Sequence, residues 1–156
     1  MTTLSDVLRL MLEYQEKNNI TSKCCANSLF FINYLKKHSA DESGTAKAVM
    51  VLIKDQMNGE EVIAGVISHM VVQMRDGLLE TSYEVTKRPP EYVLYIERFN
   101  QVKPTSENKE ILHTVLSNHI SLLAVAKKIN AGCSVVDEDG YYRALEVYVE
   151  NGLSKI

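Results

Sequence analysis

Cysteine is scarce in this chain, and the arrangement of its cysteines excludes several classes of protein. Only three occur: Cys24, Cys25 and Cys133. No C-x-x-C pair is present, so the sequence indicates neither a zinc ribbon nor a thioredoxin-type redox site. Neighbouring cysteines rarely bridge each other, and an odd count leaves one thiol free, which is typical of a protein in a reducing compartment. We therefore expect a cytoplasmic protein.

Long apolar runs and clusters of basic residues are also missing. No stretch approaches the ~20 apolar residues that a membrane-spanning helix needs, and the first segment carries acids, unlike a signal peptide. The formal net charge is -3 and the basic residues are scattered, whereas nucleic-acid backbones require clustered lysine and arginine. No phosphate loop or paired-histidine metal spacing occurs. The sequence therefore predicts no membrane, nucleic-acid, cofactor or metal partner, and it leaves the oligomeric state open.

What remains is an ordinary globular composition, with 46% hydrophobic and 24% charged residues in a chain of 156 residues. This length suits a single domain over residues 1–156. Two helices, a four-strand meander and two further helices predict the α+β class: helices flanking a small, mainly antiparallel sheet. Helical periodicity is found from residue 4 to the Asn18-Asn19 pair, over about 22–38, from after Pro104 to Ala131, and over about 138–151. Strand-like runs cover residues 48–53, 62–74, 78–85 and 92–99.

Two thiols lie at the start of the second predicted helix. The free N–H groups and the positive dipole end at this position stabilise a thiolate, which is the nucleophilic form of cysteine. Lys23 adds a neighbouring positive charge. Cys25 belongs to the apolar stripe of the helix and is expected to be buried, so Cys24, about 100° around the helix, points elsewhere. We interpret Cys24 as the candidate nucleophile.

His69 lies in the middle of a predicted strand, where it is a candidate general base. The Asp76-Gly77 pair is a strong hairpin signal, and a two-residue turn there sets His69 opposite Glu84 on one face of the hairpin. A bulge would bring Glu80 into range instead. Nucleophilic catalysis needs a base beside the nucleophile and a third group that orients the base. The spacing therefore predicts such a group and leaves two glutamates as candidates.

Three segments resemble motifs of the papain-like and transglutaminase-like superfamily. Residues 24–28 (CCANS) look like the C-Y-x-N-(A/S) segment of small transglutaminase-like domains. Residues 69–77 are similar to the hairpin that begins with the family histidine and ends in D-G, including that of arylamine acetyltransferases. Residues 78–83 resemble the segment that carries the family acid. The resemblance covers about residues 18–85, in the N-terminal half of the chain.

This resemblance implies a papain/transglutaminase-like core with Cys24 as nucleophile, His69 as general base and Glu80 as orienting acid. It implies a cysteine-dependent acyl hydrolase or acyl transferase, of peptidase, deamidase or transglutaminase type. The substrate would be a protein or a peptide-like molecule, and the intermediate a thioester, with no cofactor. An oxyanion donor would come from a side-chain amide before the nucleophile: Asn18, Asn19 or Gln15. The two asparagines have a second interpretation, in which they only end the first helix.

A second hypothesis belongs to a different class of protein. The sequence departs from the family at three positions: Glu80 replaces the usual aspartate, Thr81 the following proline, and Met70 a bulky aromatic residue. A non-catalytic binding or regulatory module with a degenerate transglutaminase-like fold would tolerate such changes. Its partner surface would then be an exposed apolar patch on the last two helices. The separation of Cys24 from His69 in the folded chain distinguishes the two hypotheses.

Overall fold

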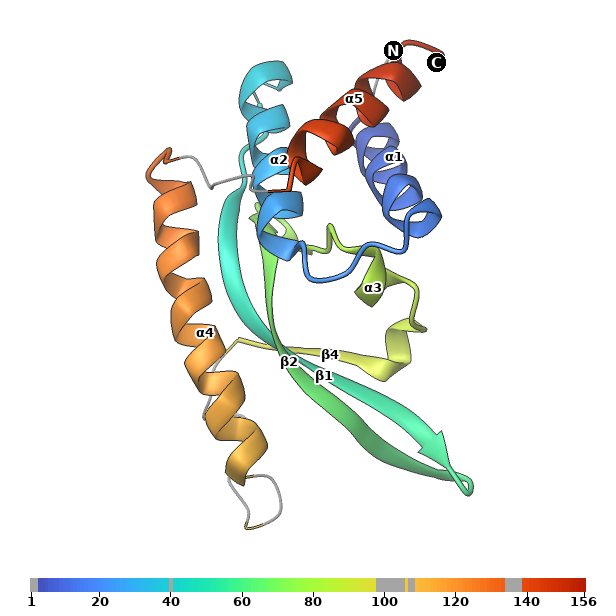
Figure 1. The fold of residues 1–156 in the computed structure, drawn as a ribbon, viewed down its shortest axis with the longest axis vertical. Coiled ribbons are helices and arrows are strands. Elements are labelled where there is room, and N and C mark those ends of the chain that lie inside the picture. The colour runs from blue at the N-terminus through green and yellow to red at the C-terminus, as the bar shows by residue number, and fades with distance from the viewer. Residues whose placement is uncertain (1–2, 40, 98–105, 107–108, 134–138) are drawn as a thin grey trace.

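The computed structural model describes residues 3–39, 41–97, 106, 109–133 and 139–156, with helices packed around one curled antiparallel sheet (Figure 1). The predicted α+β class is confirmed. The helices are α1 (Leu4–Lys17), α2 (Cys24–His38), α3 (Tyr83–Thr86), the 3-10 helix η1 (Pro90–Tyr92), α4 (Lys109–Asn130) and α5 (Tyr141–Leu153). The strands are β1 (Thr45–Met57), β2 (Glu60–Met74), β3 (Gly77–Leu79) and β4 (Val93–Ile96).

Local chemistry defines both ends of α1. Thr3 Oγ1 accepts a hydrogen bond from the Asp6 N–H at 3.2 Å, and the Thr3 N–H donates to the Asp6 carboxylate at 3.0 Å. This capping box satisfies two N–H groups that the helix leaves free. At the other end, Asn18 Nδ2 donates to the carbonyl of Tyr14 at 2.8 Å, and Asn19 takes a left-handed conformation with φ 51°. The asparagine pair therefore ends the helix, as one interpretation of the sequence predicted.

The sheet is not the predicted meander, because its strand order is β3-β2-β1-β4. β1 and β2 form a long hairpin whose turn residues, Asn58 and Gly59, have φ 54° and 78°, as a two-residue hairpin turn requires. β4 then pairs with β1 rather than with β3. The chain crosses from one edge of the sheet to the other through α3 and η1. Residues 98 and 99, at the end of the last predicted strand, lie outside the described residues, as does residue 138 at the predicted start of the last helix.

The β2–β3 hairpin also differs from its predicted register. Met74 pairs with Gly77 and Gln73 with Leu78, so Arg75 and Asp76 are the turn residues. Gly77 has φ 148°, a conformation that only glycine adopts readily, and it follows the turn rather than forming its second residue. The predicted strand over residues 78–85 ends at Leu79, because the chain turns into α3 a few residues later.

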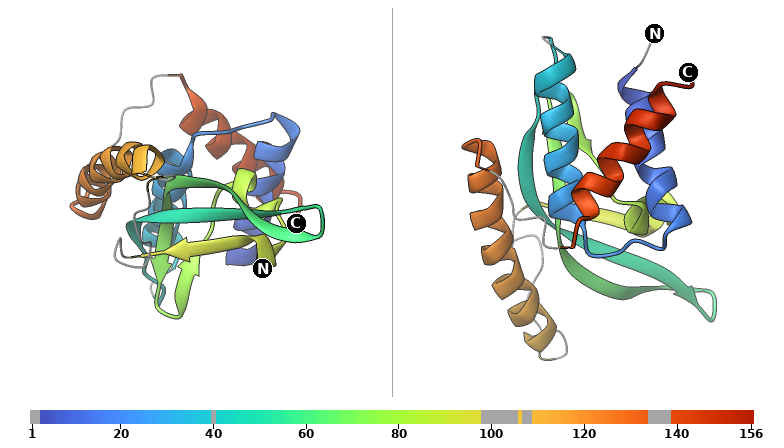
Figure 2. Two further views of the ribbon diagram at one scale, coloured as in Figure 1. Left: turned by 90° about the horizontal axis from the view of Figure 1, so that it is seen from below. Right: turned by 45° about the horizontal axis from the view of Figure 1, so that its top comes forward.

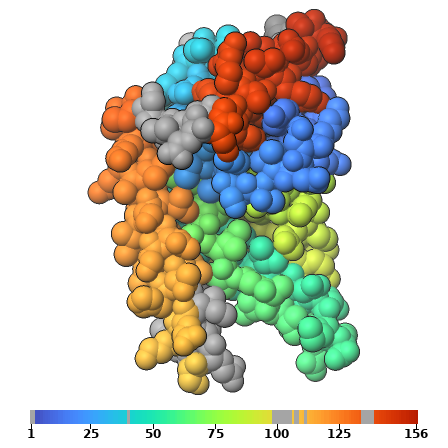
Figure 3. All heavy atoms as spheres, in the orientation of Figure 1, coloured from blue at the N-terminus to red at the C-terminus, as the bar shows by residue number. Residues whose placement is uncertain are grey.

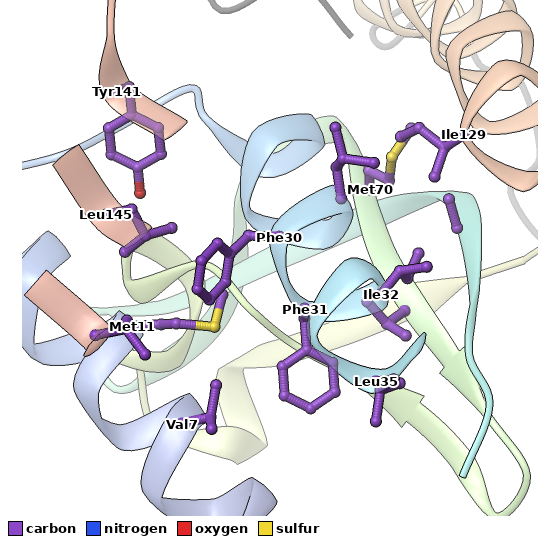
Figure 4. Packing of buried hydrophobic residues seen from close by; sticks show 14 of the residues in the cluster. Val7, Met11, Phe30, Phe31, Ile32, Leu35, Met70, Ile129, Tyr141 and Leu145 are labelled. Atoms are coloured by element: carbon purple, nitrogen blue, oxygen red, sulfur yellow. The ribbon is translucent and has the colours of Figure 1, made fainter. Parts of the chain in front are cut away.

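Both faces of the sheet are partly covered, while the tip of the β1–β2 hairpin is exposed. α2 and α4 cover one face, and α3 packs on the other, where Val85 joins a cluster with Val49 and Val71. The largest cluster lies between α1, α2, α5 and the sheet, centred on Phe31, which is 1% exposed (Figure 4). α4 lies along the sheet, apart from α1 and α5 (Figure 2). None of the described helices is both long and apolar enough to cross a membrane.

Close packing of α1 on α5 depends on a glycine. A Cβ atom at Gly152 would lie 2.5 Å from Leu10 Cδ2, inside van der Waals contact. We predict that Gly152→Val lowers the free energy of unfolding by about 1–3 kcal/mol, as overpacking of a tight interface does. Urea denaturation measures this. The same change at Gly65, where a Cβ would meet nothing within 4 Å, is the control. Equal losses at both positions would contradict this account.

Candidate active site

The structure brings Cys24, His69 and Glu80 together. Cys24 is the first residue of α2, His69 lies in β2, and Glu80 directly follows β3. The His69 ring is 1% exposed, and its Nε2 lies 2.7 Å from Glu80 Oε2. The Cys24 thiol interacts with the same ring: His69 acts to lower the pKa of the thiol, and Cys24 acts to raise the pKa of His69. The three side chains therefore form a continuous chain from thiol to imidazole to carboxylate.

Glu80 is held in place by two further donors. The Ser82 N–H donates to Oε2 at 3.1 Å, and the Tyr95 hydroxyl donates to Oε1 at 2.7 Å. Tyr95 comes from β4, which is separated from β2 by β1. The sequence carries no signal for this contact, because it depends on the long-range pairing of β4. With His69, Ser82 and Tyr95 all bonded to it, the carboxylate is held in one orientation.

The neighbours of His69 favour its protonated form. Burial alone would lower the pKa of His69, because a buried imidazolium loses its hydration. Hydrogen bonds to Cys24 and Glu80, together with the negative charge of Glu80, outweigh burial and raise the pKa to about 10. An imidazolium at neutral pH is the partner that stabilises a thiolate.

The two neighbouring thiols are coupled to each other. A hydrogen bond from Cys24 lowers the pKa of Cys25, although burial opposes it. The pKa of Cys24 is raised, first by its contact with Cys25 and then by burial, while His69 acts in the opposite direction. The prediction that Cys25 is buried is wrong: it is half-buried and lines the same cleft as Cys24. The first turn of α2 lies at the end of the helix, so its apolar stripe does not extend the core that far.

Glu84, the other candidate acid, has a different position. It lies in the first turn of α3, and its Oε1 accepts a hydrogen bond from the Ser22 N–H at 3.2 Å. Ser22 has φ 59°, in the left-handed region, two residues before Cys24. Glu84 thus anchors the segment that leads into α2. The β2–β3 pairing ends at Val72 and Leu79, so Glu84 lies outside the hairpin, whereas Glu80 directly follows β3 and meets His69.

The amides predicted as oxyanion donors have other partners. Gln15 is 1% exposed; its Nε2 donates to the Thr81 carbonyl at 2.9 Å, and its Oε1 accepts from the Tyr83 N–H at 2.8 Å. It therefore holds the segment that carries Glu80. Asn18 and Asn19 belong to the end of α1. None of the three is among the described residues that line the cleft beside Cys24.

Asn27, within the motif that resembles the family, extends this buried network. Its Nδ2 donates to Gln15 Oε1 at 3.2 Å and to the Ser82 hydroxyl at 3.1 Å. Its Oδ1 accepts from the Tyr141 hydroxyl at 2.6 Å. Side chains from α1, α2 and α5 are thereby tied to the segment after β3. The role of Asn27 was not predicted, although its motif had drawn attention to the segment.

Lys23 does not point its charge at the thiols. Its Nζ forms an ion pair with the Asp139 carboxylate and lies 5.7 Å from the centre of the Tyr141 ring. The positive charge of Lys23, which was expected to favour a thiolate, therefore lies at the start of α5 instead. Lys23 is also the N-cap residue of α2 and supplies no side-chain cap, so the first-turn N–H groups of α2 are not capped by it.

A cleft of about 820 Å³ lies next to the Cys24–His69 pair. Residues 66–69 of β2 form one wall, the inner face of α4 forms the other, and both thiols and Glu84 line it as well. In Figure 3, green atoms of β2 come to the surface beside the orange atoms of α4. The reactive groups are thus accessible from a space large enough for a substrate.

Comparisons with protein families, curated proteins and solved structures gave no match. Within the part of the chain that the structure describes, no group of three metal-ligating side chains is found.

We predict that Tyr95→Phe weakens the hold on Glu80. The change removes one hydroxyl and leaves Glu80 Oε1, on a side chain that is 10% exposed, without its donor. A lost hydrogen bond to a charged group is worth about 1.5–3 kcal/mol. Urea denaturation should show a loss of this order, and NMR titration should show a lower pKa for His69. Tyr92→Phe in η1 is the matched control. An equal effect of that change would contradict the role given to the Tyr95 hydroxyl.

The raised pKa of His69 makes stability depend on pH. Because the value rises from 6.5 to about 10 on folding, protonation of His69 favours the folded state. Its contribution is complete below pH 6.5 and is lost as the pH rises through about 10. We predict that His69→Gln removes this part of the pH dependence. Denaturation midpoints of both proteins across this range measure it; parallel curves would rule out the charged pair.

Proposed function

We propose that this protein is a cysteine-dependent acyl hydrolase or acyl transferase that acts through Cys24, His69 and Glu80. One observation carries the proposal: the His69 ring is bonded to the Glu80 carboxylate and interacts with the Cys24 thiol, at the edge of a cleft that both Cys24 and His69 line. A core histidine that only needed a partner for its ring would be satisfied by one of these groups. A nucleophile, a base and an orienting acid in contact are what covalent acyl transfer requires.

In the proposed reaction, the Cys24 sulfur attacks the carbonyl carbon of an amide or ester. The proton of the thiol–imidazole pair is already held on His69, and the imidazolium gives it to the leaving amine or alcohol as the carbon–leaving-group bond breaks. This leaves a thioester on Cys24. Water or an amine attacks the thioester while His69 takes its proton, and the acid or new amide departs as the Cys24 thiolate is released. Glu80 holds the ring in orientation and stabilises its positive charge throughout.

The developing oxyanion needs donors, and the start of α2 offers them. The first N–H groups of a helix have no partner within the helix, and the dipole of α2 places positive charge at this end. Cys24 is itself the first residue of α2, so these groups lie beside the attacking sulfur. They take the role that the sequence had assigned to a side-chain amide.

The arrangement of elements also supports a papain/transglutaminase-like core as part of this proposal. The cysteine begins a helix that packs on the sheet, the histidine lies on a strand of that sheet, and the acid follows the next turn. This is the order and placement that the resemblance implies. The helices α4 and α5 have no counterpart in the motifs that carry it.

Labelling with iodoacetamide across pH, with the modified residue identified by mass spectrometry, tests the nucleophile. We predict that Cys24→Ala abolishes rapid labelling near neutral pH. In the Cys24→Ala protein, Cys25 loses the hydrogen bond that lowers its pKa. Burial still raises the pKa of Cys25. Cys25→Ala should keep labelling at Cys24, because the contact with His69 remains.

Two outcomes would contradict this assignment. If Cys25→Ala is the change that silences labelling, Cys25 is the nucleophile and the site must be redrawn around it. If Cys24 in the wild-type protein labels like an ordinary thiol of pKa about 8.5, His69 does not activate it. His69→Gln and Glu80→Gln are the matched variants, and both should slow labelling without unfolding the protein.

The alternative, a non-catalytic binding module, has one observation in its favour. Leu116, Ile120 and Leu123 are 40%, 59% and 45% exposed and share the outer face of α4. Such a stripe is suited to a partner surface. A wide separation of thiol and imidazole would have left only this alternative, but the two groups line the same cleft and each shifts the pKa of the other. Failure of all electrophilic labelling at Cys24 would favour the module.

A further inference from the structure

The cleft beside Cys24 has an unusual charge. Glu84 and Glu110 are the acids among its lining residues, and no lysine or arginine lines it within the described part of the chain. His69 is the one group there whose protonation adds positive charge, and Glu80 directly behind it balances that charge. The empty cleft therefore carries a net negative charge, in a concave site where fields are focused.

Neither cleft carboxylate is neutralised by a base. Glu84 accepts a hydrogen bond from the Ser22 N–H, and no ion pair to Glu84 or Glu110 occurs among the described residues. Lys23, the base nearest to the thiols in sequence, is paired with Asp139 instead. Two carboxylates left without a cation in one cleft are positioned to receive one from a ligand.

The shape of the cleft favours an extended chain. Along α4, its lining runs from Glu110 to Leu122, a distance of about 18 Å at 1.5 Å per residue. An extended polypeptide of about five residues has this length. Thr114, Asn118 and Ser121 line the same wall and offer hydrogen bonds to a peptide backbone.

The opposite wall is a free edge of the sheet. β2 pairs with β3 only at residues 72–74, so over residues 60–71 this edge has no strand partner within the described chain. Residues 66–69 all line the cleft, although successive strand residues point to opposite faces. The cleft therefore opens onto the strand edge itself, where unpaired N–H and C=O groups can receive an added strand.

We infer that the cleft binds an extended polypeptide segment with lysine or arginine side chains, which lies along the β2 edge at residues 66–69 and is selected by Glu84 and Glu110. Glu84, which anchors the segment before Cys24, receives the cation nearer the thiol. Glu110, three helical turns before Leu122, receives one farther along the chain. This inference rests on the proposed function, because it assigns the substrate class to that site, but binding can be measured without any reaction.

Fluorescence anisotropy of labelled hexapeptides with the full-length Cys24→Ala protein tests the inference. The probes are an alanine-based peptide with two arginines, the same peptide with two glutamines, and the same peptide with two glutamates. We expect the arginine peptide to bind most tightly, the glutamate peptide most weakly, and the preference to fall with added salt. Glu84→Gln and Glu110→Gln should each weaken arginine-peptide binding roughly two- to fivefold, the range of a partly exposed ion pair.

The controls separate charge, strand addition and chemistry. Glu16→Gln on the exposed face of α1 removes the same charge away from the cleft and should change nothing. An arginine peptide N-methylated at alternate residues should bind more weakly, because it cannot complete a strand ladder. Equal binding of all three peptides, a preference that survives in the Glu84→Gln, Glu110→Gln double variant, no effect of N-methylation, or no peptide binding would each overturn the inference.

A second readout distinguishes failure of this inference from failure of the proposed function. Wild-type protein is treated with chloromethyl ketones of the arginine and glutamate peptides, and labelling of Cys24 is followed by mass spectrometry. Selective binding with no labelling would remove the proposed function and leave the inference standing. Equal labelling by both reagents, together with equal binding, would overturn the inference and leave the nucleophile standing.

Discussion

The contact between the Glu80 carboxylate and the His69 ring is the interaction on which the rest of the site depends. Both groups are almost fully removed from water, and a buried charge is costly unless it is paired and hydrogen-bonded. Ser82 and Tyr95 supply the additional donors that make the carboxylate acceptable there. Because the donors come from different parts of the sheet, the site exists only when the sheet edges are assembled. The thiol then meets an imidazole whose charge and orientation are already determined.

A second constraint lies behind Glu80, in the buried amides of Gln15 and Asn27. They connect α1, α2 and α5 to the segment of residues 80–83, so the two amides help to position the acid although neither lines the cleft. Polar groups in an otherwise apolar core permit few alternative arrangements, since each one left unpaired costs free energy. The same helix, α2, therefore provides the thiol at its first residue and, one turn later, an amide that fixes the acid.

The two thiols at the start of α2 share the positive end of the helix dipole, which favours a thiolate. His69 acts to stabilise a thiolate on Cys24, whereas the contact between the two thiols favours a thiolate on Cys25 and disfavours one on Cys24. Negative charge in the cleft acts against a second anion, since the two cleft glutamates already lie nearby. A cationic ligand would relieve this repulsion and favour the thiolate, which links selection of the ligand to activation of the nucleophile.

Local features were predictable from the sequence by itself: the α1 capping box, the helix that starts at the thiols, and the strand that carries His69. These depend on residues a few positions apart. Tertiary structure alone decided that β4 lies beside β1 and brings Tyr95 to Glu80, that the hairpin turn falls on Arg75 and Asp76, and that Gln15 faces the Glu80 segment. Strand pairing and register are determined by which distant side chains pack together, and a two-residue shift of register costs little in local propensity. Because β3 ends at Leu79, Glu84 lies on α3, and Glu80 is the residue that meets His69.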